Sequence, residues 1–197
     1  MFIRPLNTPG REGQHYMTDI NIENIVAHAQ IADNLDIKKI YERLPEAIYN
    51  PEEFSGLTYK IEDPKTVILL LPSGKLICTG VKGFEDVEQV IKKFVNRLEE
   101  VDIKLKDDID VEIKNIIVSS KLKKELHLSS ISKGLLLENV DYEPSHFPGL
   151  IYRMDDIGAT LLVFSSGKIV CTGTNDIEIA TNAIDMMKEK LSSIGAL

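Results

Sequence analysis

The chain contains a long internal repeat. Residues 49–80 align with residues 142–173 without a gap, and 14 of the 32 aligned positions are identical. Upstream of this segment the offset changes from 93 to 91 residues, as in the match of Asn24 with Asn115. This period is much longer than the unit of a solenoid. The sequence therefore predicts two fused halves of similar fold.

Each half predicts the same order of elements. In residues 24–31 apolar and polar side chains alternate cleanly, which indicates a strand. A short helix follows, with Asp33 or Asn34 as its N-cap, and then three antiparallel strands and a long amphipathic helix. The fold class is therefore α+β, built as two tandem pseudo-symmetric repeats. We expect a flexible N-terminal tail at 1–18, a first repeat at 19–106 and a second repeat at 107–197.

The composition argues against a membrane protein, a secreted protein and a disulfide-rich or all-cysteine zinc protein. No apolar run is long enough to span a bilayer, and the polar first residues lack the apolar centre of a signal peptide, so we expect an intracellular protein without a membrane partner. The two cysteines are too few for a disulfide framework or an all-cysteine zinc site. Cys78 and Cys171 occupy matched positions and are predicted to be buried.

The predicted sheet is apolar on both faces. In the strand at residues 66–71, Ile68 and Leu70 would face the core, whereas Val67, Leu69 and Leu71 would point the opposite way. Two helices per half can cover one side of such a sheet. The other side remains an exposed apolar surface, which normally marks a binding site for protein, lipid or nucleic acid.

Polar side chains on that exposed surface favour DNA. Amide and hydroxyl donors occur there at matched positions, and they suit the adenine N3 and thymine O2 acceptors of an A·T-rich minor groove. Cations along the edges would meet phosphates. The net charge of −8 opposes non-specific nucleic-acid binding, so the argument depends on local charge. The donors are Asn24, Asn115, Thr79 and Thr172, and the edge cations are Lys60, Lys75, Arg153 and Lys168.

The motifs YNPEEFSGL, SGKLICTG, YEPSHFPGLIYRM and SGKIVCTG, in this order, resemble those of the TATA-box-binding proteins, and are most similar to the archaeal members. The resemblance covers about residues 19–192. It implies one curved antiparallel sheet, a saddle, with helices on the convex face. It also implies a general transcription initiation factor that binds and bends the TATA-box promoter element through the minor groove. The partners would be double-stranded A·T-rich promoter DNA, transcription factor B and RNA polymerase, in the cytoplasm or nucleoid of an archaeon, or in a eukaryotic nucleus.

The same resemblance implies roles for individual residues. Phe54, Leu71, Phe147 and Phe164 take the positions of the wedges that enter the base stack. Glu143, Ser145 and His146 lie where the family contacts transcription factor B. The full set of DNA-binding residues implied is Asn24, Val26, Phe54, Lys60, Leu69, Leu71, Ser73, Lys75, Ile77, Thr79, Asn115, Ile117, Phe147, Arg153, Leu162, Phe164, Ser166, Lys168, Val170 and Thr172.

Three departures from the family pattern support an alternative function. Glu53 replaces a residue that is basic in many members, Leu71 replaces a phenylalanine, and Ser145 replaces an acid. The alternative is a divergent regulatory protein-interaction module with weakened TATA binding. We find no motif for catalysis, a metal or a cofactor, so a saddle-shaped domain that serves an enzyme is a remote third interpretation. A second copy of the chain is a further candidate partner for the exposed sheet when DNA is absent.

Overall fold

A computed structural model describes residues 2–4, 6, 19–135 and 139–197. The chain forms two compact units, the first built mainly from residues 24–114 and the second mainly from residues 115–197. In each unit helices pack against one face of an antiparallel sheet. The prediction of an α+β fold made of two repeats is confirmed.

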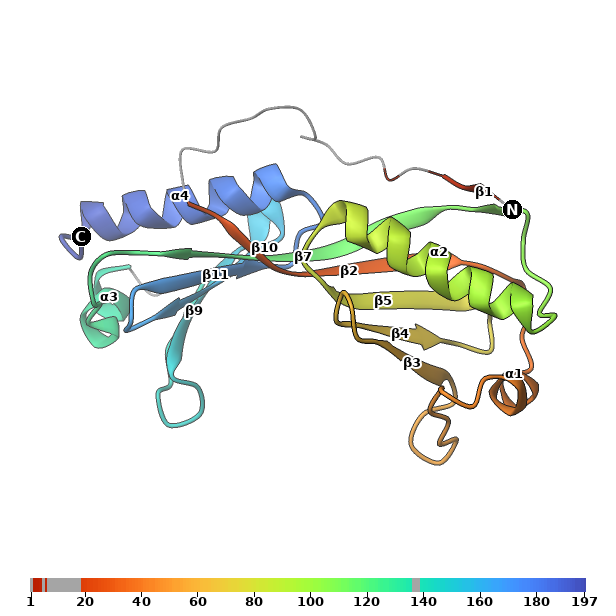
Figure 1. The fold of residues 1–197 in the computed structure, drawn as a ribbon. Helices are drawn as coiled ribbons and strands as arrows, with labels where there is room; N and C mark the ends of the chain where they lie inside the picture. Colours follow the sequence, from red (N-terminus) through yellow and green to blue (C-terminus); the bar gives the residue numbers. More distant parts are fainter. Residues whose placement is uncertain (1, 5, 7–18, 136–138) are drawn as a thin grey trace. The chain divides into compact units, whose positions relative to one another are not determined.

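The first unit has the strand order β3-β4-β5-β2, and all of its neighbouring strands are antiparallel. Its long helix α2 lies along the sheet (Figure 1). The elements are β2 (Asn21–Gln30), α1 (Ile37–Arg43), β3 (Leu57–Ile61), β4 (Thr66–Leu70), β5 (Lys75–Val81) and α2 (Phe84–Glu100).

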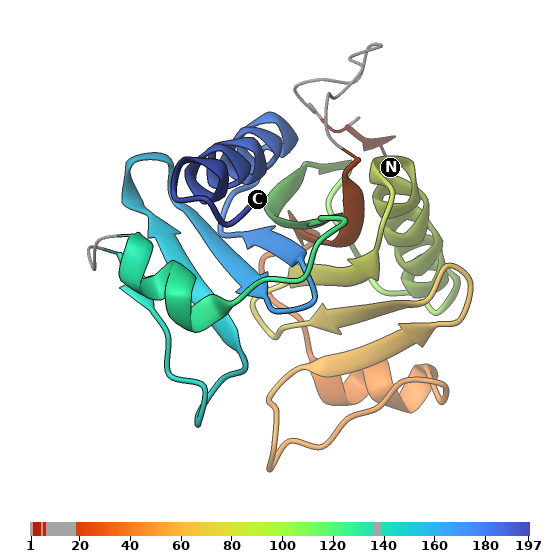
Figure 2. The ribbon, with the colours of Figure 1, turned by 90° about the vertical axis from the view of Figure 1, so that its left-hand side faces the viewer.

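The second unit repeats this arrangement with the strand order β7-β11-β10-β9-β8. Figure 2 shows α4 lying along one side of its strands. The elements are β7 (Val111–Lys121), α3 (Leu128–Gly134), β8 (Val140–Asp141), β9 (Gly149–Met154), the 3-10 turn η1 (Asp155–Ile157), β10 (Ala159–Phe164), β11 (Lys168–Thr172) and α4 (Ile177–Ser193).

The core of each unit lies between the helices and one face of the sheet. From Ile25 to Ala29 in β2 every second residue is buried, as the alternation predicted, with Ile25 and Ala27 fully inaccessible. Helix α2 covers this face, and the Phe94 ring lies 4.9 Å from the Tyr59 ring on β3. Each fully buried aliphatic side chain contributes about 1.5–3 kcal/mol through removal of its surface from water. This burial fixes which side chains remain on the opposite face.

The start of the chain differs from the predicted flexible tail. Strand β1 (Phe2–Ile3) pairs in parallel with β6 (Asp108–Ile109), and Arg4 forms an ion pair of 3.4 Å with Asp108. Leu6 is buried, and its backbone N–H donates to Glu88 on α2. The tail prediction is wrong for residues 2–4 and 6, because their partners are distant in sequence. Its remaining residues, 1, 5 and 7–18, lie outside the described residues.

Helix α1 begins later than predicted. Its N-cap is Asp36, whose carboxylate accepts a hydrogen bond of 3.1 Å from the backbone N–H of Lys39. The backbone N–H of Leu35 is bonded to the carbonyl of Pro72, which keeps the chain non-helical up to Asp36. The prediction of Asp33 or Asn34 as the cap is therefore wrong.

The unit boundaries also differ from the predicted repeat boundaries. Residues 19–23 belong to the second unit, where Glu23 is bonded to Ser119 and Lys168. Residues 107–114 belong to the first unit, where β6 pairs with β1. Sequence repetition marks duplicated segments, whereas side-chain contacts decide which residues form one compact unit.

Candidate nucleic-acid interface

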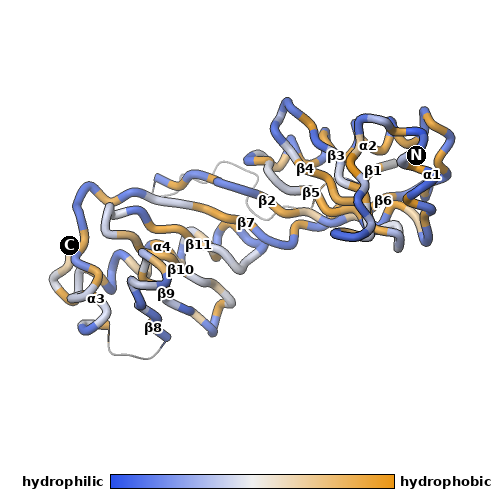
Figure 3. Tube along the Cα trace, turned by 90° about the horizontal axis from the view of Figure 1, so that it is seen from below, coloured by the Kyte–Doolittle hydropathy of each residue, from blue (hydrophilic) through white to orange (hydrophobic). Residues whose placement is uncertain are grey.

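Each unit has a sheet face that points away from the helices, and we call it the outer face; all of its side chains except the buried Ser119 stay at least partly exposed. The apolar character of the strands that carry it is visible in Figure 3. The first unit contributes Asn24, Val26, His28, Thr58, Lys60, Val67, Leu69, Leu71, Lys75, Ile77 and Thr79. The second unit contributes Asn115, Ile117, Ser119, Ile151, Arg153, Thr160, Leu162, Phe164, Lys168, Val170 and Thr172. The aliphatic residues that the resemblance implies for DNA binding are among them, namely Val26, Leu69, Ile77, Ile117, Leu162 and Val170.

Strand register brings the aliphatic residues of the outer face together. In the first unit Leu69 lies opposite Ile77 on β5 and opposite Thr58 on β3. In the second unit Leu162 lies opposite Val170 on β11 and opposite Ile151 on β9. Directly opposed residues in an antiparallel pair place their side chains in contact. Each unit therefore presents a continuous apolar strip.

An asparagine and a threonine form the same network in both units. The Asn24 amide nitrogen donates to the Thr79 hydroxyl at 3.0 Å, and the Gly80 backbone N–H donates to Asn24 Oδ1 at 2.7 Å. In the second unit Asn115 donates to Thr172 at 3.1 Å. The Gly173 backbone N–H donates to Asn115 Oδ1 at 2.9 Å.

This network fixes the orientation of each amide. Because a backbone N–H can only donate, its bond to Oδ1 identifies that atom as the oxygen and the other as the NH₂ group. One amide hydrogen engages threonine, and the second remains for an acceptor. The glycine is required because its φ is +108° at Gly80 and +98° at Gly173, a region that side chains disfavour. Each unit thus presents an oriented donor in an apolar surface.

The wedge positions of the second unit form an aromatic pair. The rings of Phe147 and Phe164 are 5.9 Å apart in an edge-to-face arrangement, and both are partly exposed. A Cβ atom at Gly149 would lie 2.7 Å from the Phe147 ring and 3.1 Å from the Phe164 ring. The absence of a side chain at Gly149 therefore makes room for both rings.

The first unit has the same arrangement with one ring fewer. A Cβ atom at Gly56 would lie 2.7 Å from the Phe54 ring. Leu71 follows β4 at the position that corresponds to Phe164, and its backbone N–H donates to the Lys75 carbonyl at 2.9 Å. Both side chains are partly exposed. The predicted wedge positions of the first unit thus hold one aromatic and one aliphatic residue.

The predicted edge cations are not equivalent. Lys60 and Arg153 are exposed on the outer strands β3 and β9, and neither forms an ion pair with a described residue. Lys75 at the start of β5 likewise has no ion pair in the described part of the chain. Lys168, its counterpart on β11, is bonded to the Glu23 carboxylate at 2.8 Å.

The backbone carbonyls of the hairpin residues Ser73 and Ser166 each accept a hydrogen bond from a side chain of a neighbouring strand. The Ser73 carbonyl accepts a hydrogen bond of 2.6 Å from the side chain of Gln30, and the Ser166 carbonyl accepts one of 2.5 Å from Lys121. Both serines are exposed. Gln30 and Lys121 themselves were not predicted. The sequence could have indicated them, because Gln30 and Lys121 are the last residues of β2 and β7 that the strand alternation places on the outer face.

A hollow of about 400 Å³ opens beside His28 in the first unit. Burial lowers the pKa of His28, the positive charges of Lys75 and Lys114 lower it further, and the Glu112 carboxylate opposes them. Lys114 is bonded to Glu112. The imidazole is therefore held toward its neutral form, with one ring N–H as a donor.

The three predicted partner-binding residues lie together in the turn before β9, which protrudes from the sheet (Figure 1). All three are exposed. The Ser145 hydroxyl donates to the Glu143 carboxylate at 2.6 Å, and the backbone N–H of His146 donates to the Glu143 carbonyl at 3.0 Å. The turn presents a carboxylate and an imidazole to solvent.

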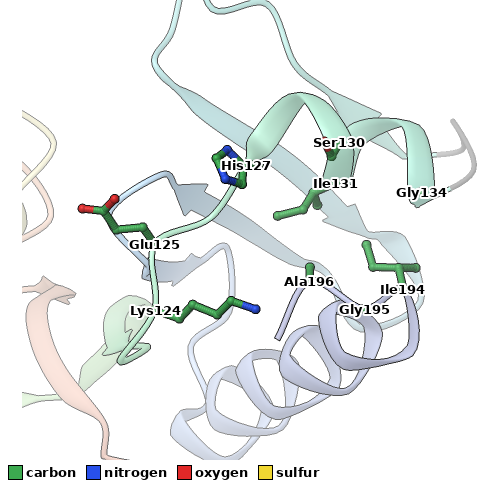
Figure 4. A pocket seen from close by; sticks show the side chains of 9 residues that line it. All are labelled: Lys124, Glu125, His127, Ser130, Ile131, Gly134, Ile194, Gly195 and Ala196. Carbon is green, nitrogen blue, oxygen red and sulfur yellow. The ribbon is translucent and has the colours of Figure 1, made fainter.

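A second hollow, of about 200 Å³, lies away from the outer face in the second unit. It is bounded by α3 and the end of α4 (Figure 4), with Ile131 and Ile194 among its lining residues and Lys124 and His127 at its polar side. None of the residues predicted to bind DNA or a partner lines it.

Cys78 and Cys171 are fully buried, as predicted, and burial raises their pKa values to about 12 and about 11. Among the described residues no group of three or more His, Cys, Asp or Glu side chains is placed to hold a metal ion. No helix in the described ranges has the length and apolarity to cross a membrane.

Register reveals outer-face residues that the sequence reasoning did not assign. Thr58 lies opposite Leu69, and Ile151 opposite Leu162. Glu23 was also missed, and it is the residue that binds Lys168. Alternation within β3 and β9 would have identified the first two, whereas nothing local indicates the third.

Known proteins match this chain over most of its length. The family model described as transcription factor TFIID, or TATA-binding protein, matches residues 19–101 and 110–194. "TATA-box-binding protein E" of Halobacterium salinarum is 42% identical over 185 residues, which are 92% of this chain and 100% of that protein. The "TATA-box-binding protein" of Thermoplasma volcanium is 43% identical over 178 residues, covering 90% of this chain and 97% of that protein.

A solved structure, "Methanococcus jannaschii TBP", matches with a TM-score of 0.80 and 36% identity, covering 88% of this chain and 98% of that one. The matched fold and the two matched segments agree with each other. The chain belongs to the TATA-box-binding protein family.

Proposed function

We propose that this chain is a general transcription initiation factor that binds and bends the TATA-box promoter element through the minor groove. Family membership and the names of the archaeal relatives support this function. The observation that carries it is the oriented amide donor in a partly exposed apolar strip, present once in each unit. Two such donors suit the acceptors at the floor of an A·T-rich groove.

The other outer-face residues supply the remaining parts of the interaction. The aliphatic strips pack on the sugars and base edges of the widened groove. The pairs Phe54 with Leu71 and Phe147 with Phe164 enter the base stack at its ends, as minor-groove wedges do. Lys60, Lys75 and Arg153 meet phosphates. The outer faces of both units act on one duplex, as in the saddle implied by the resemblance.

Recruitment of transcription factor B and RNA polymerase is part of the proposal. The exposed turn that contains Glu143, Ser145 and His146 is the proposed contact for transcription factor B. The protein would act at the nucleoid inside an archaeal cell. Binding, bending and recruitment are all non-covalent, so the function requires neither a cofactor nor catalysis.

A titration with three duplexes tests the minor-groove proposal. Fluorescence anisotropy is measured with an A·T-rich duplex, with the same duplex carrying inosine·cytosine pairs, and with a G·C-rich duplex. Inosine·cytosine resembles A·T in the minor groove and G·C in the major groove. We expect similar affinity for the first two and much weaker binding to the third. Equal affinity for all three would refute the proposal.

A matched pair of variants tests the donor network. Asn115→Ala removes the oriented amide, and we expect it to weaken binding to the A·T-rich duplex by about tenfold or more. Asn182→Ala removes an exposed asparagine from α4 and is expected to leave the affinity unchanged. Equal losses in the two variants would show that the outer face is not the binding surface.

The alternative function is a regulatory protein-interaction module with weakened TATA binding. The ion pair between Glu23 and Lys168 favours this alternative, because the Glu23 carboxylate neutralises a lysine that was expected to bind phosphate. Exposed Glu53 beside Phe54 adds negative charge at a wedge. Weak binding to every duplex, together with stable binding to a protein partner, would support this alternative.

A further inference from the structure

A carboxylate lies among the proposed DNA contacts of the second unit. Glu23 on β2 accepts a hydrogen bond of 2.8 Å from the Lys168 ammonium and one of 2.8 Å from the Ser119 hydroxyl. Ser119 is 4% exposed, whereas the side chains of Glu23 and Lys168 are 32% and 44% exposed. The pair is therefore anchored on a buried hydroxyl and open to solvent.

The corresponding site in the first unit has the opposite charge. By the repeat, Lys114 takes the position of Glu23, His28 that of Ser119, and Lys75 that of Lys168. These three residues surround one hollow and influence each other electrostatically. Glu112 binds Lys114, and Lys75 keeps no carboxylate partner among the described residues. The repeats thus differ in charge at equivalent positions.

We propose that Glu23 neutralises Lys168 and so gives the two repeats unequal attraction for phosphate. This inference rests on the proposed function. A lysine that contacts phosphate releases a condensed counterion, but a lysine already paired with a carboxylate adds little net charge to the interface. Lys75 contributes fully, whereas the pair formed by Glu23 and Lys168 contributes almost nothing.

The consequence is a division of roles between the repeats. The first repeat combines an unmasked Lys75 with the smaller wedge Leu71 and depends more on phosphate charge. The second repeat combines a masked Lys168 with the ring pair Phe147 and Phe164 and depends more on insertion into the base stack. Salt should therefore weaken the contacts of the first repeat more than those of the second.

The test is a set of variants titrated with one A·T-rich duplex at several salt concentrations. Glu23→Gln keeps an oxygen that can accept from Ser119 and Lys168 but removes the charge. We expect three- to fivefold tighter binding at about 0.1 M salt, given the small energy of exposed ion pairs. The slope of log affinity against log salt should steepen by about 0.9. Lys75→Gln, the matched control, should make the slope shallower by a similar amount.

Two further variants isolate the role of Lys168. The double variant Glu23→Gln with Lys168→Gln should return to the wild-type slope, because the net charge of the site is restored. The same gain in the double variant as in Glu23→Gln alone would overturn the proposal, since Glu23 would then act without Lys168. An unchanged slope in Glu23→Gln would overturn it as well.

Lys114→Glu provides an independent check by placing an acid at the equivalent exposed position of the first unit. It should weaken binding and make the salt slope shallower, and no change would count against the proposal. Thermal unfolding confirms that each variant is folded. Titration of the wild-type protein distinguishes a failure of the proposed function from a failure of the role of Glu23. If it binds no duplex with sequence preference, the proposed function fails. If it does bind, and Glu23→Gln is unchanged, only the role of Glu23 is refuted.

Discussion

Single residues on the outer face are positioned by neighbours that lack a side chain. Gly149 admits the rings of Phe147 and Phe164, and Gly80 and Gly173 supply the N–H groups that orient the two asparagines. A substitution at these glycines would displace a functional side chain without touching DNA. The properties of the proposed interface thus depend on small residues behind it.

The wedge residues are expected to be unequal. Phe164→Ala removes a ring that packs edge-on against Phe147, so we expect a larger loss of DNA affinity than from Leu71→Ala, which removes only an aliphatic side chain. Gel-shift titrations on the same A·T-rich duplex compare the two variants. A greater loss for Leu71→Ala would show that the assignment of wedge roles is wrong.

The two thiols should be inert in the folded protein. Burial raises the pKa of Cys171 to about 11 and that of Cys78 to about 12, so at pH 8 the thiolate fraction is reduced on the order of 100-fold or more relative to an unfolded chain. Their contribution to stability is complete below the unfolded pKa near 9 and is lost as pH rises toward the folded values. Labelling rates with a thiol reagent, with and without denaturant, measure this difference. Equal rates would contradict it.

At the level of elements, the short helix α1 depends on its cap. Asp36→Ala removes the bond from the Lys39 N–H and should lower the free energy of unfolding by about 1 kcal/mol. Asn34→Ala, two residues earlier and exposed, should have no measurable effect. Urea unfolding followed by circular dichroism distinguishes the caps, and a larger effect at Asn34 would place the helix start where the sequence predicted it.

The first strand is a second feature that long-range contacts decide. β1 pairs with β6, and Leu6 is buried beside α2. The composition of residues 1–18 predicted a tail, because proline, glycine and charged residues interrupt any periodicity. A strand of two residues carries almost no local signal. Its conformation is stabilised by a partner more than a hundred residues away in the sequence.

At the level of the whole molecule, two similar units differ in charge and in wedge chemistry. The formal net charge is −8, yet each outer face carries cations at its edges. The acidic excess therefore opposes non-specific binding to nucleic acid, while the local cations allow binding at a groove that fits. Both repeats contribute to the DNA affinity and to its salt dependence, so these two quantities are properties of the whole chain.

An exposed apolar strip also predicts self-association in the absence of DNA. We expect the free protein to form a dimer through its outer faces and an A·T-rich duplex to dissociate it. Leu69→Lys should weaken the dimer, whereas Met186→Lys, at an exposed position on α4, should not. Sedimentation velocity at several protein concentrations measures the equilibrium. A dimer that persists on DNA, or that is insensitive to Leu69→Lys, would exclude this interface.

The sequence by itself determined the duplication, the strand alternation and the apolar character of both sheet faces. Ile25 and Ala27 face the core and Asn24 and Val26 face outward because side chains in a strand alternate with a period of two, which is a local property. The tertiary structure decided the cap at Asp36, the pairing of β1 and the bond between Glu23 and Lys168. The β1 pairing and the Glu23–Lys168 bond join residues that are distant in sequence, and the start of α1 at Asp36 follows from the bond between Leu35 and the distant Pro72. Such proximity depends on how the strands are ordered and paired, and no local pattern of side chains encodes it.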